Sequence, residues 1–274
     1  MRKLMGFLLL ACWQVCLYAG NYEVVSPDGK LKVALTVSDG LGMEVFYDGQ
    51  SLFGALNMGL CLQQQPFKPV ARSVKRSSVN EIITPVVPLK FVSVANHYNA
   101  LRLNLKGNLA IEFRAYDDGM AYRFVTNGDG KKTLVYNETA DFYLPEEAVL
   151  HLQQPVGFKT PYEEPYSHVA MKERKDGSKF ALLPLLVDTK KGVKLLFSES
   201  DLYAYPCMFL KANEGKGVSA LFPRYPLETK PISDRSVNVV READYIAETQ
   251  AKRTFPWRYV VVAREDSDLV ENTF

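Results

Sequence analysis

The sequence predicts an all-β protein, folded as a large antiparallel β-sandwich in which two broad sheets face each other. Three observations support this fold class. Apolar and polar residues alternate with period two over most of the chain, and glycine-containing dipeptides separate the apolar runs. No helical stripe extends over three turns before the C-terminal end. Such alternation is typical of half-buried strands, and closely spaced short strands are typical of sandwiches.

The strand-like runs extend from the N-terminal part of the chain to its end. The first clear run covers residues 30–37, where apolar side chains occupy alternate positions from Leu31 to Val37. Residues 101–106 and 109–114 repeat this pattern, and further runs cover residues 182–187, 193–197, 237–240 and 259–263. Because no helical segments separate these runs, long parallel βαβ units are excluded.

Turn dipeptides mark where the strands reverse. Asp48-Gly49, Asp118-Gly119 and Lys191-Gly192 each separate two apolar runs. Asp and Gly tolerate the positive φ angles that tight hairpins need, so we expect a hairpin at each position. The first 19 residues apart, no linker or repeat divides the chain, which predicts one β-sandwich domain over residues 20–274.

The charge balance does not favour nucleic-acid binding. The 274 residues include 33 Lys+Arg and 31 Asp+Glu, and basic residues do not gather in blocks. The mixed group at residues 172–176 is interpreted as a solvated turn. Two cysteines, Cys61 and Cys207, follow the first 19 residues; their spacing fits no zinc site, and both a disulfide and two buried thiols remain open.

The N-terminus has the pattern of an export signal. Arg2 and Lys3 precede an apolar stretch, and Ala19 provides a small residue for cleavage. The stretch is too short and too interrupted for a membrane span. We therefore expect a signal peptide over residues 1–19 and a periplasmic product. A lipoprotein signal ending at Cys12, with a lipid anchor at the outer membrane, is the alternative.

Candidate catalytic motifs are few. The three histidines form no metal-binding pattern, and the adjacent Glu163 and Glu164 point to opposite faces if they lie on a strand. Residues 157–168 combine aromatic rings, carboxylates, a hydroxyl and a histidine, which suits a carbohydrate site. The same segment also fits a surface loop in which Tyr162 and Tyr166 are fixed on the core.

A set of ordered motifs resembles a known family, the amino-terminal domain of glycoside hydrolase family 97, from about Tyr22 onward. Each motif is weak alone, but their order and spacing together are specific. They are Ser26-Pro27-Asp28-Gly29, Asn96-His97-Tyr98-Asn99, the segment from Phe113 to Phe124, Tyr162-Glu163-Glu164-Pro165-Tyr166, Tyr205-Pro206-Cys207-Met208 and Pro256-Trp257-Arg258.

The resemblance implies a galactose-mutarotase-like β super-sandwich that precedes a catalytic (β/α)8 barrel and a small C-terminal β domain. The family's catalytic carboxylates lie on the barrel, so no catalytic role carries over to this chain. The family's active site holds a calcium ion with one glutamate from the sandwich, which matches Glu163; an alternative alignment gives Glu164. The resemblance also makes five residues candidates for the substrate side: Asn96, His97, Asn99, Tyr162 and Tyr166. For Asn96, His97 and Asn99 the alternative is that they hold a turn together.

These implications predict that the chain is the amino-terminal module of an exported α-glucosidase or α-galactosidase. We expect this module to be inactive alone. Its expected partners are an α-linked glucoside or galactoside and the absent barrel. The apolar pattern that starts at Ser267 breaks off at Phe274, which indicates that the coding sequence continues. Two alternatives remain: a stand-alone carbohydrate-binding module, and a mutarotase-type epimerase that uses His97, His168 and Glu163 as acid and base.

Overall fold

The computed structural model describes residues 20–64, 66–174, 179–214 and 216–273. It is 61% strand and 4% helix, which confirms the all-β prediction. The expected signal peptide, residues 1–19, lies outside the described residues. Among those that are described, no helix is long and apolar enough to cross a membrane.

The strands follow one another closely. They are β1 (Gly20–Val25), β2 (Leu31–Val37), β3 (Leu41–Tyr47), β4 (Gln50–Leu62), β5 (Ala71–Ile83), β6 (Val94–Leu105), β7 (Leu109–Tyr116), β8 (Gly119–Tyr143), β9 (Val149–Gln153), β10 (Tyr166–Ala170), β11 (Phe180–Ala181), β12 (Leu185–Asp188), β13 (Lys194–Ser200), β14 (Phe209–Asn213), β15 (Gly217–Leu221), β16 (Pro226–Pro231), β17 (Val237–Glu242), β18 (Ala247–Thr254) and β19 (Trp257–Ala263). A 3-10 turn, η1 (Met171–Glu173), and one short helix, α1 (Asp266–Glu271), complete the chain.

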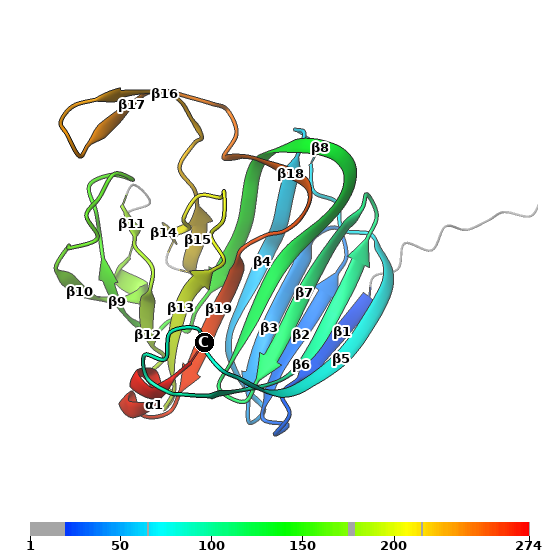
Figure 1. Cartoon of the computed structure of the whole chain (residues 1–274). Coiled ribbons are helices and arrows are strands. Elements are labelled where there is room, and N and C mark those ends of the chain that lie inside the picture. The colour runs from blue at the N-terminus through cyan, green and yellow to red at the C-terminus, as the bar shows by residue number, and fades with distance from the viewer. Residues whose placement is uncertain (1–19, 65, 175–178, 215, 274) are drawn as a thin grey trace, which may run out of the picture.

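The strands form two facing layers that share the long strand β8 (Figure 1). The first half of β8 pairs with β7 and β19, which gives the order β5-β6-β7-β8-β19-β13-β12-β9-β10. Its second half pairs with β4 and β15, which gives β1-β2-β3-β4-β8-β15-β14-β11. These pairings are antiparallel, and β18 pairs along the middle of β8. We call the two layers the first and the second sheet.

Alternating side chains from both sheets fill the space between them. Leu31, Val33, Leu35 and Val37 on β2 are at most 1% exposed, as the period-two pattern predicts. On β7 the same alternation buries Leu109, Ile111 and Phe113, and on β13 it buries Phe197. Each fully buried Leu or Phe stabilises the fold by about 1.5–3 kcal/mol.

The turns follow the expected positions with one difference. Asp48 and Gly49 adopt φ angles of 48° and 80°, which confirms the tight β3–β4 hairpin, and Gly192 has φ 74° between β12 and β13. At the β7–β8 hairpin, however, Asp117 and Asp118 form the turn, and Gly119 is already a buried residue of β8. The reason is that this turn proceeds without positive φ, so glycine is not needed in it.

The mixed-charge group, of which residues 172–174 are described, begins inside η1 and also differs from its interpretation as a solvated turn. Lys172 and Glu173 are exposed, but Arg174 is only 5% exposed and donates a hydrogen bond to the Leu210 carbonyl oxygen at 3.2 Å. The apolar stem of arginine can be buried where the guanidinium finds a backbone acceptor, and charge alternation in sequence does not reveal this.

Two segments extend beyond the sandwich. The hairpin of β16 and β17 forms a separate two-stranded sheet, and every residue in its strands is exposed (Figure 1). The β5–β6 connection, residues 84–93, reaches across to α1, where Lys90 Nζ donates to the carbonyl oxygens of Val270 and Asn272. We call this connection the apolar strap because it exposes Val86, Val87, Leu89, Phe91 and Val92.

Candidate functional site

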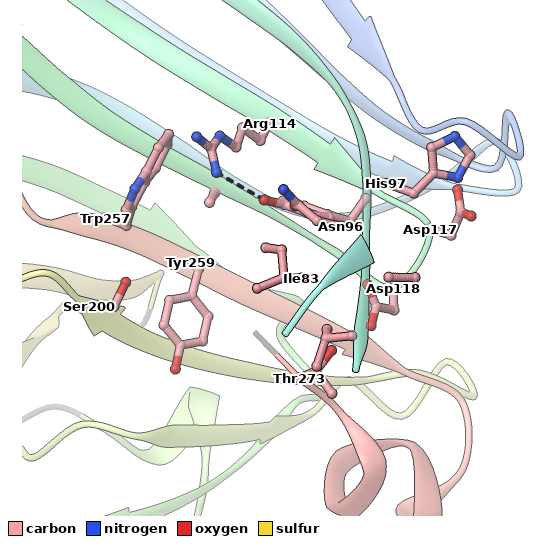
Figure 2. A pocket seen from close by; sticks show the side chains of 14 residues that line it. Ile83, Asn96, His97, Arg114, Asp117, Asp118, Ser200, Trp257, Tyr259 and Thr273 are labelled. Atoms are coloured by element: carbon pink, nitrogen blue, oxygen red, sulfur yellow. Dashed lines mark hydrogen bonds between the residues drawn. The ribbon is translucent and has the colours of Figure 1, made fainter. Parts of the chain in front are cut away.

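A cavity of about 540 Å³ opens on the first sheet where several strand ends meet. In Figure 2, Asn96 and Ile83 lie between Arg114 and Thr273, and Tyr259 borders one side. A volume in this range suits a small organic ligand. The cavity is lined by Ile83, Val94, Ala95, Asn96, His97, Arg114, Tyr116, Asp117, Asp118, Ala121, Ser200, Trp257, Tyr259 and Thr273.

A ladder of stacked cations and rings forms one wall of this cavity. The Arg114 guanidinium lies 4.4 Å from the Tyr98 ring centroid and 4.3 Å from that of Trp257. Arg123 lies 4.2 Å from the same Trp257 ring. Arg114 also donates to the Tyr116 hydroxyl at 3.2 Å. Cation–π contacts fix both guanidinium groups, so the wall offers positive charge in a set orientation.

Glu112 extends the ladder by pairing with two arginines. Its carboxylate accepts hydrogen bonds from Arg102 at 2.5 Å and from Arg123 at 2.8 Å. Burial alone would raise the pKa of Glu112, but the hydrogen bonds and charges of the two arginines outweigh burial and lower it. Glu112 therefore stays ionised and holds Arg123 against Trp257.

Two adjacent carboxylates border the cavity at the β7–β8 turn. Asp117 accepts a hydrogen bond from the Asp28 amide at 2.9 Å, and Asp118 accepts one from Asn272 at 2.7 Å. Burial, and then the neighbouring charge of Asp117, raise the pKa of Asp118. Carboxylates at the border of a cavity are hydrogen-bond acceptors for the hydroxyl groups of a sugar.

The opposite side of β19 carries a buried ionic cluster. Arg258 donates to both oxygens of Glu138, at 2.9 and 3.0 Å, and also pairs with Glu199. The Tyr205 hydroxyl donates to Glu138 at 2.9 Å, and the Met208 amide donates to Glu199. Burial raises the pKa of Glu199 to about 7. Trp257 and Arg258 are adjacent on β19 and point to opposite sides. Trp257 packs in the cavity wall, and Arg258 binds the carboxylates of the buried cluster.

Residues 154–165, between β9 and β10, form a second candidate region, which we call the Glu163 loop. Phe158 stacks on Phe180 at 4.9 Å and contacts Phe209 edge-on at 5.0 Å. Tyr162 has φ 62° and a hydrogen bond with the Cys207 thiol. A positive φ is uncommon for a bulky residue and persists only where surrounding contacts hold it. The backbone just before Glu163 is therefore fixed by packing.

Glu163 itself is exposed, and Glu164 is half-buried with its carbonyl accepting a hydrogen bond from Gln153. In the described part of the chain, no three or more His, Cys, Asp or Glu side chains gather in a group suited to a metal ion. Because calcium takes six to eight oxygen ligands, these residues fit a single-ligand contribution and not a self-contained site. The metal role of Glu163 stays a prediction.

The structure separates the predicted site residues. Asn96 and His97 line the cavity, whereas Asn99 accepts a hydrogen bond from Ser78 and donates one to the Val25 carbonyl oxygen beside another depression. Tyr162, Glu163 and Tyr166 belong to the Glu163 loop or its end and are exposed.

The strand order also separates two of the three residues proposed for an epimerase. His97 is on β6 and His168 on β10, at opposite ends of the first sheet. At about 4.8 Å per strand, the path between them is on the order of 30 Å. This strand order does not favour His97 and His168 as a pair that acts on one sugar carbon, and the epimerase alternative stays a prediction.

Local sequence patterns do not reveal most of the cavity. Arg114, Tyr116 and Trp257 occur in the family motifs, but nothing in their local pattern distinguishes a cavity wall from an ordinary strand. Their signal is the convergence of two motifs, residues 113–124 and 256–258, on adjoining strands β7, β8 and β19. Cys61 and Cys207, whose pairing was open, are both present as thiols.

Comparisons with known proteins agree with this architecture. The glycosyl-hydrolase 97 N-terminal family model matches residues 24–274. A retaining alpha-galactosidase of Bacteroides thetaiotaomicron is 31% identical over 285 residues, which cover 98% of this chain and 43% of that protein.

Solved structures show the same fold. A glycoside hydrolase family 97 enzyme from Pseudoalteromonas sp. strain K8, in complex with acarbose, superposes with a TM-score of 0.73 at 16% identity, over 92% of this chain and 38% of that one. A beta-arabinopyranosidase superposes with a TM-score of 0.71 at 20% identity, over 89% and 40%. The chain therefore spans less than half the length of these relatives.

Proposed function

The chain belongs to the glycosyl-hydrolase 97 N-terminal family, and from this membership we propose that it is the sandwich module of an exported α-glycosidase. In this proposal it packs against a catalytic domain outside the given sequence and supplies part of the carbohydrate site. It does not itself carry the catalytic carboxylates.

Two observations together carry the proposal. The chain covers only part of the length of its relative, and it exposes apolar side chains. The alpha-galactosidase relative is more than twice as long as the matched region. The chain exposes Phe158, Tyr162 and Tyr166 by 38%, 43% and 57%, and the apolar strap exposes Val86 and Leu89 even more. Exposed apolar patches of this kind mark surfaces that pack against a partner.

In the proposed full-length protein, Glu163 supplies one oxygen ligand to a calcium ion whose other ligands come from the catalytic domain. Its exposure and the fixed backbone at Tyr162 support this role. When bound, a calcium ion supplies positive charge that orients a sugar hydroxyl or a carboxylate. The chain's own part is to present the Glu163 carboxylate on a loop held by Phe158, Phe180 and Phe209.

The substrate class in this proposal is an α-linked glycoside. The relative at 31% identity is a retaining alpha-galactosidase, which makes an α-galactoside the first substrate to test and an α-glucoside the second. The proposed location is the periplasm, with cleavage after Ala19, or the outer membrane if Cys12 carries a lipid. Intact-mass measurement of the natural product distinguishes these: a product that begins at Met1 contradicts export.

A second candidate function is stand-alone carbohydrate binding, and the cavity favours it. Tyr259, Trp257 and Arg114 border a space of about 540 Å³ beside Asp117 and Asp118. Such a module should bind galactose or glucose by titration calorimetry, and Arg114→Ala should abolish that binding. An inert sandwich module should bind neither sugar.

The test of the leading proposal is the size of the natural gene product. An antibody raised against this chain should detect, in the source organism, a protein more than twice as large as the chain. A natural product of the size of this chain alone would contradict the proposal and favour the binding module.

A further inference from the structure

His151 and His168 lie directly opposite each other on the neighbouring strands β9 and β10. Side chains of opposed residues in an antiparallel pair project from the same face of the sheet. Here that face is the outer one, because Leu150 and Leu152 alternate with His151 and are fully buried. His168 is exposed and His151 is half-buried, so the pair is accessible from solvent.

The two imidazole rings meet nitrogen to nitrogen. Their Nδ1 atoms are 2.6 Å apart, and the rings are nearly perpendicular with centroids 4.6 Å apart. Two nitrogens this close hold at most one proton between them, so at least one of them directs a lone pair at the other. Burial, and then the charge of His168, lower the pKa of His151. The neutral form of His151, which is the form that binds metal ions, is therefore favoured.

The charges that face the pair are compensated. Asp188 on β12, Lys190 in the following turn and Lys194 on β13 are the charged groups that act on His151. Lys190 Nζ pairs with Asp188 at 2.7 Å, and Lys194 pairs with Asp266. Because each lysine has a carboxylate partner, their repulsion of a bound cation is reduced.

We propose that His151 and His168 bind a divalent transition-metal ion, such as zinc, through their Nδ1 atoms, with water completing the coordination. Imidazole nitrogen suits Zn²⁺, Ni²⁺ and Cu²⁺, whereas calcium takes oxygen ligands. With Zn–N bonds of about 2.0–2.1 Å at tetrahedral angles, the two nitrogens would be about 3.3 Å apart. Metal binding therefore requires the two Nδ1 atoms to move apart by about 0.7 Å, and the His168 side chain that would move is exposed.

The position of the pair gives the ion a structural consequence. β9 and β10 are the two strands that flank the Glu163 loop, and the histidines lie two residues below its base at Gln153 and Tyr166. A bound ion would join the strands there and restrain the loop. This inference goes beyond the proposed function, since it requires neither a sugar nor a catalytic domain.

The test is calorimetric titration of ZnCl₂ into the tag-free chain at pH 7.5, after removal of metal with EDTA. We expect one saturable site, a loss of at least tenfold in affinity for His151→Ala and for His168→Ala, and no change for His97→Ala. His97 is an exposed histidine of β6 and serves as the matched control. At pH 5 the binding should weaken, because protons compete with the metal ion for the imidazole nitrogens.

Two results would overturn the inference. The first is the absence of saturable zinc binding by the wild-type chain. The second is an affinity that His168→Ala leaves unchanged. His168 is exposed, so its replacement should preserve the fold, and an unchanged circular dichroism spectrum checks this. The experiment is independent of the calcium proposal, because Glu163→Gln should leave zinc binding unaltered.

Discussion

At the residue scale, the buried cluster around Arg258 combines two carboxylates with one guanidinium. Glu138 takes two of the arginine's hydrogen bonds, so Glu199 shares the remaining charge and its pKa rises to about 7 through burial. In the unfolded chain the same carboxyl loses its proton near its ordinary pKa of 4.5. Between these values the folded state holds a proton that the unfolded state has lost.

The contribution of Glu199 to stability should therefore decrease as the pH rises from about 4.5 to about 7, and stay constant above that. The slope is at most about 1.4 kcal/mol per pH unit. Urea unfolding of wild type and Glu199→Gln at pH 5 and pH 8 tests this. The wild type should lose more stability over this range than the variant.

The comparison with the variant is necessary because His151 also changes the stability of the chain in a neighbouring pH range. Its effect on stability has the opposite dependence on pH. Its pKa is lowered in the folded state, so its contribution grows as the pH rises toward 6.5. Subtracting the two proteins removes this contribution. Equal pH slopes for wild type and Glu199→Gln would contradict the account of the cluster.

Replacing Glu163 and Glu138 by glutamine should change the unfolding free energy by very different amounts. Glu163 is exposed, so Glu163→Gln should change the unfolding free energy by less than about 0.5 kcal/mol. Glu138 is 3% exposed and pairs with Arg258, so Glu138→Gln should destabilise the chain by about 3–5 kcal/mol. Denaturant unfolding of both variants measures this. If Glu163→Gln unfolds the chain, Glu163 is structural and its metal role is wrong.

At the element scale, the β16–β17 hairpin differs from the other strands. Every residue of both strands is exposed, and they pair only with each other. An isolated two-stranded hairpin is marginally stable in water. Hydrogen exchange should therefore show little protection in residues 226–242 and strong protection in β2 and β7. Equal protection of the hairpin and the sandwich strands would contradict this.

The elements also show what could be predicted from the sequence. Strands β2 and β7 and the second half of β6 were predicted because a buried face every second residue leaves a local pattern. Residues 96–99 were expected to precede the strand, but they lie inside β6. The continuation of β8 from one sheet into the other was not predicted. The β7–β8 hairpin is local, but the pairing of β8 with β4 joins residues that are distant in sequence. Asp118-Gly119 was placed one residue late, since a turn without positive φ does not require its glycine.

The site was less predictable than the strands for a similar reason. Glu163, Tyr162 and Tyr166 could be identified as an exposed aromatic and acidic loop from composition. The Trp257–Arg114 wall forms only when β19 pairs beside β8, which no local pattern reveals. The sequence therefore indicates candidate binding residues, but it does not indicate that they divide between the cavity and the Glu163 loop.

At the scale of the whole molecule, the chain is a folded sandwich with two segments that expose apolar side chains, the apolar strap and the Glu163 loop. The apolar strap meets α1 near the C-terminal end of the chain, and the Glu163 loop lies at the far edge of the first sheet. Both features fit a module that is stable by itself but contributes to function through a partner domain. In the proposed function, the catalytic carboxylates come from that partner domain.

The most direct test of this central claim is the hydrolysis of an aryl α-galactoside and an aryl α-glucoside by the purified 274-residue chain, with and without calcium. The account predicts no turnover above the buffer rate, and Glu163→Gln should behave identically. Turnover that co-purifies with the chain and disappears in Glu163→Gln would contradict it, because the chain would then carry a catalytic carboxylate of its own.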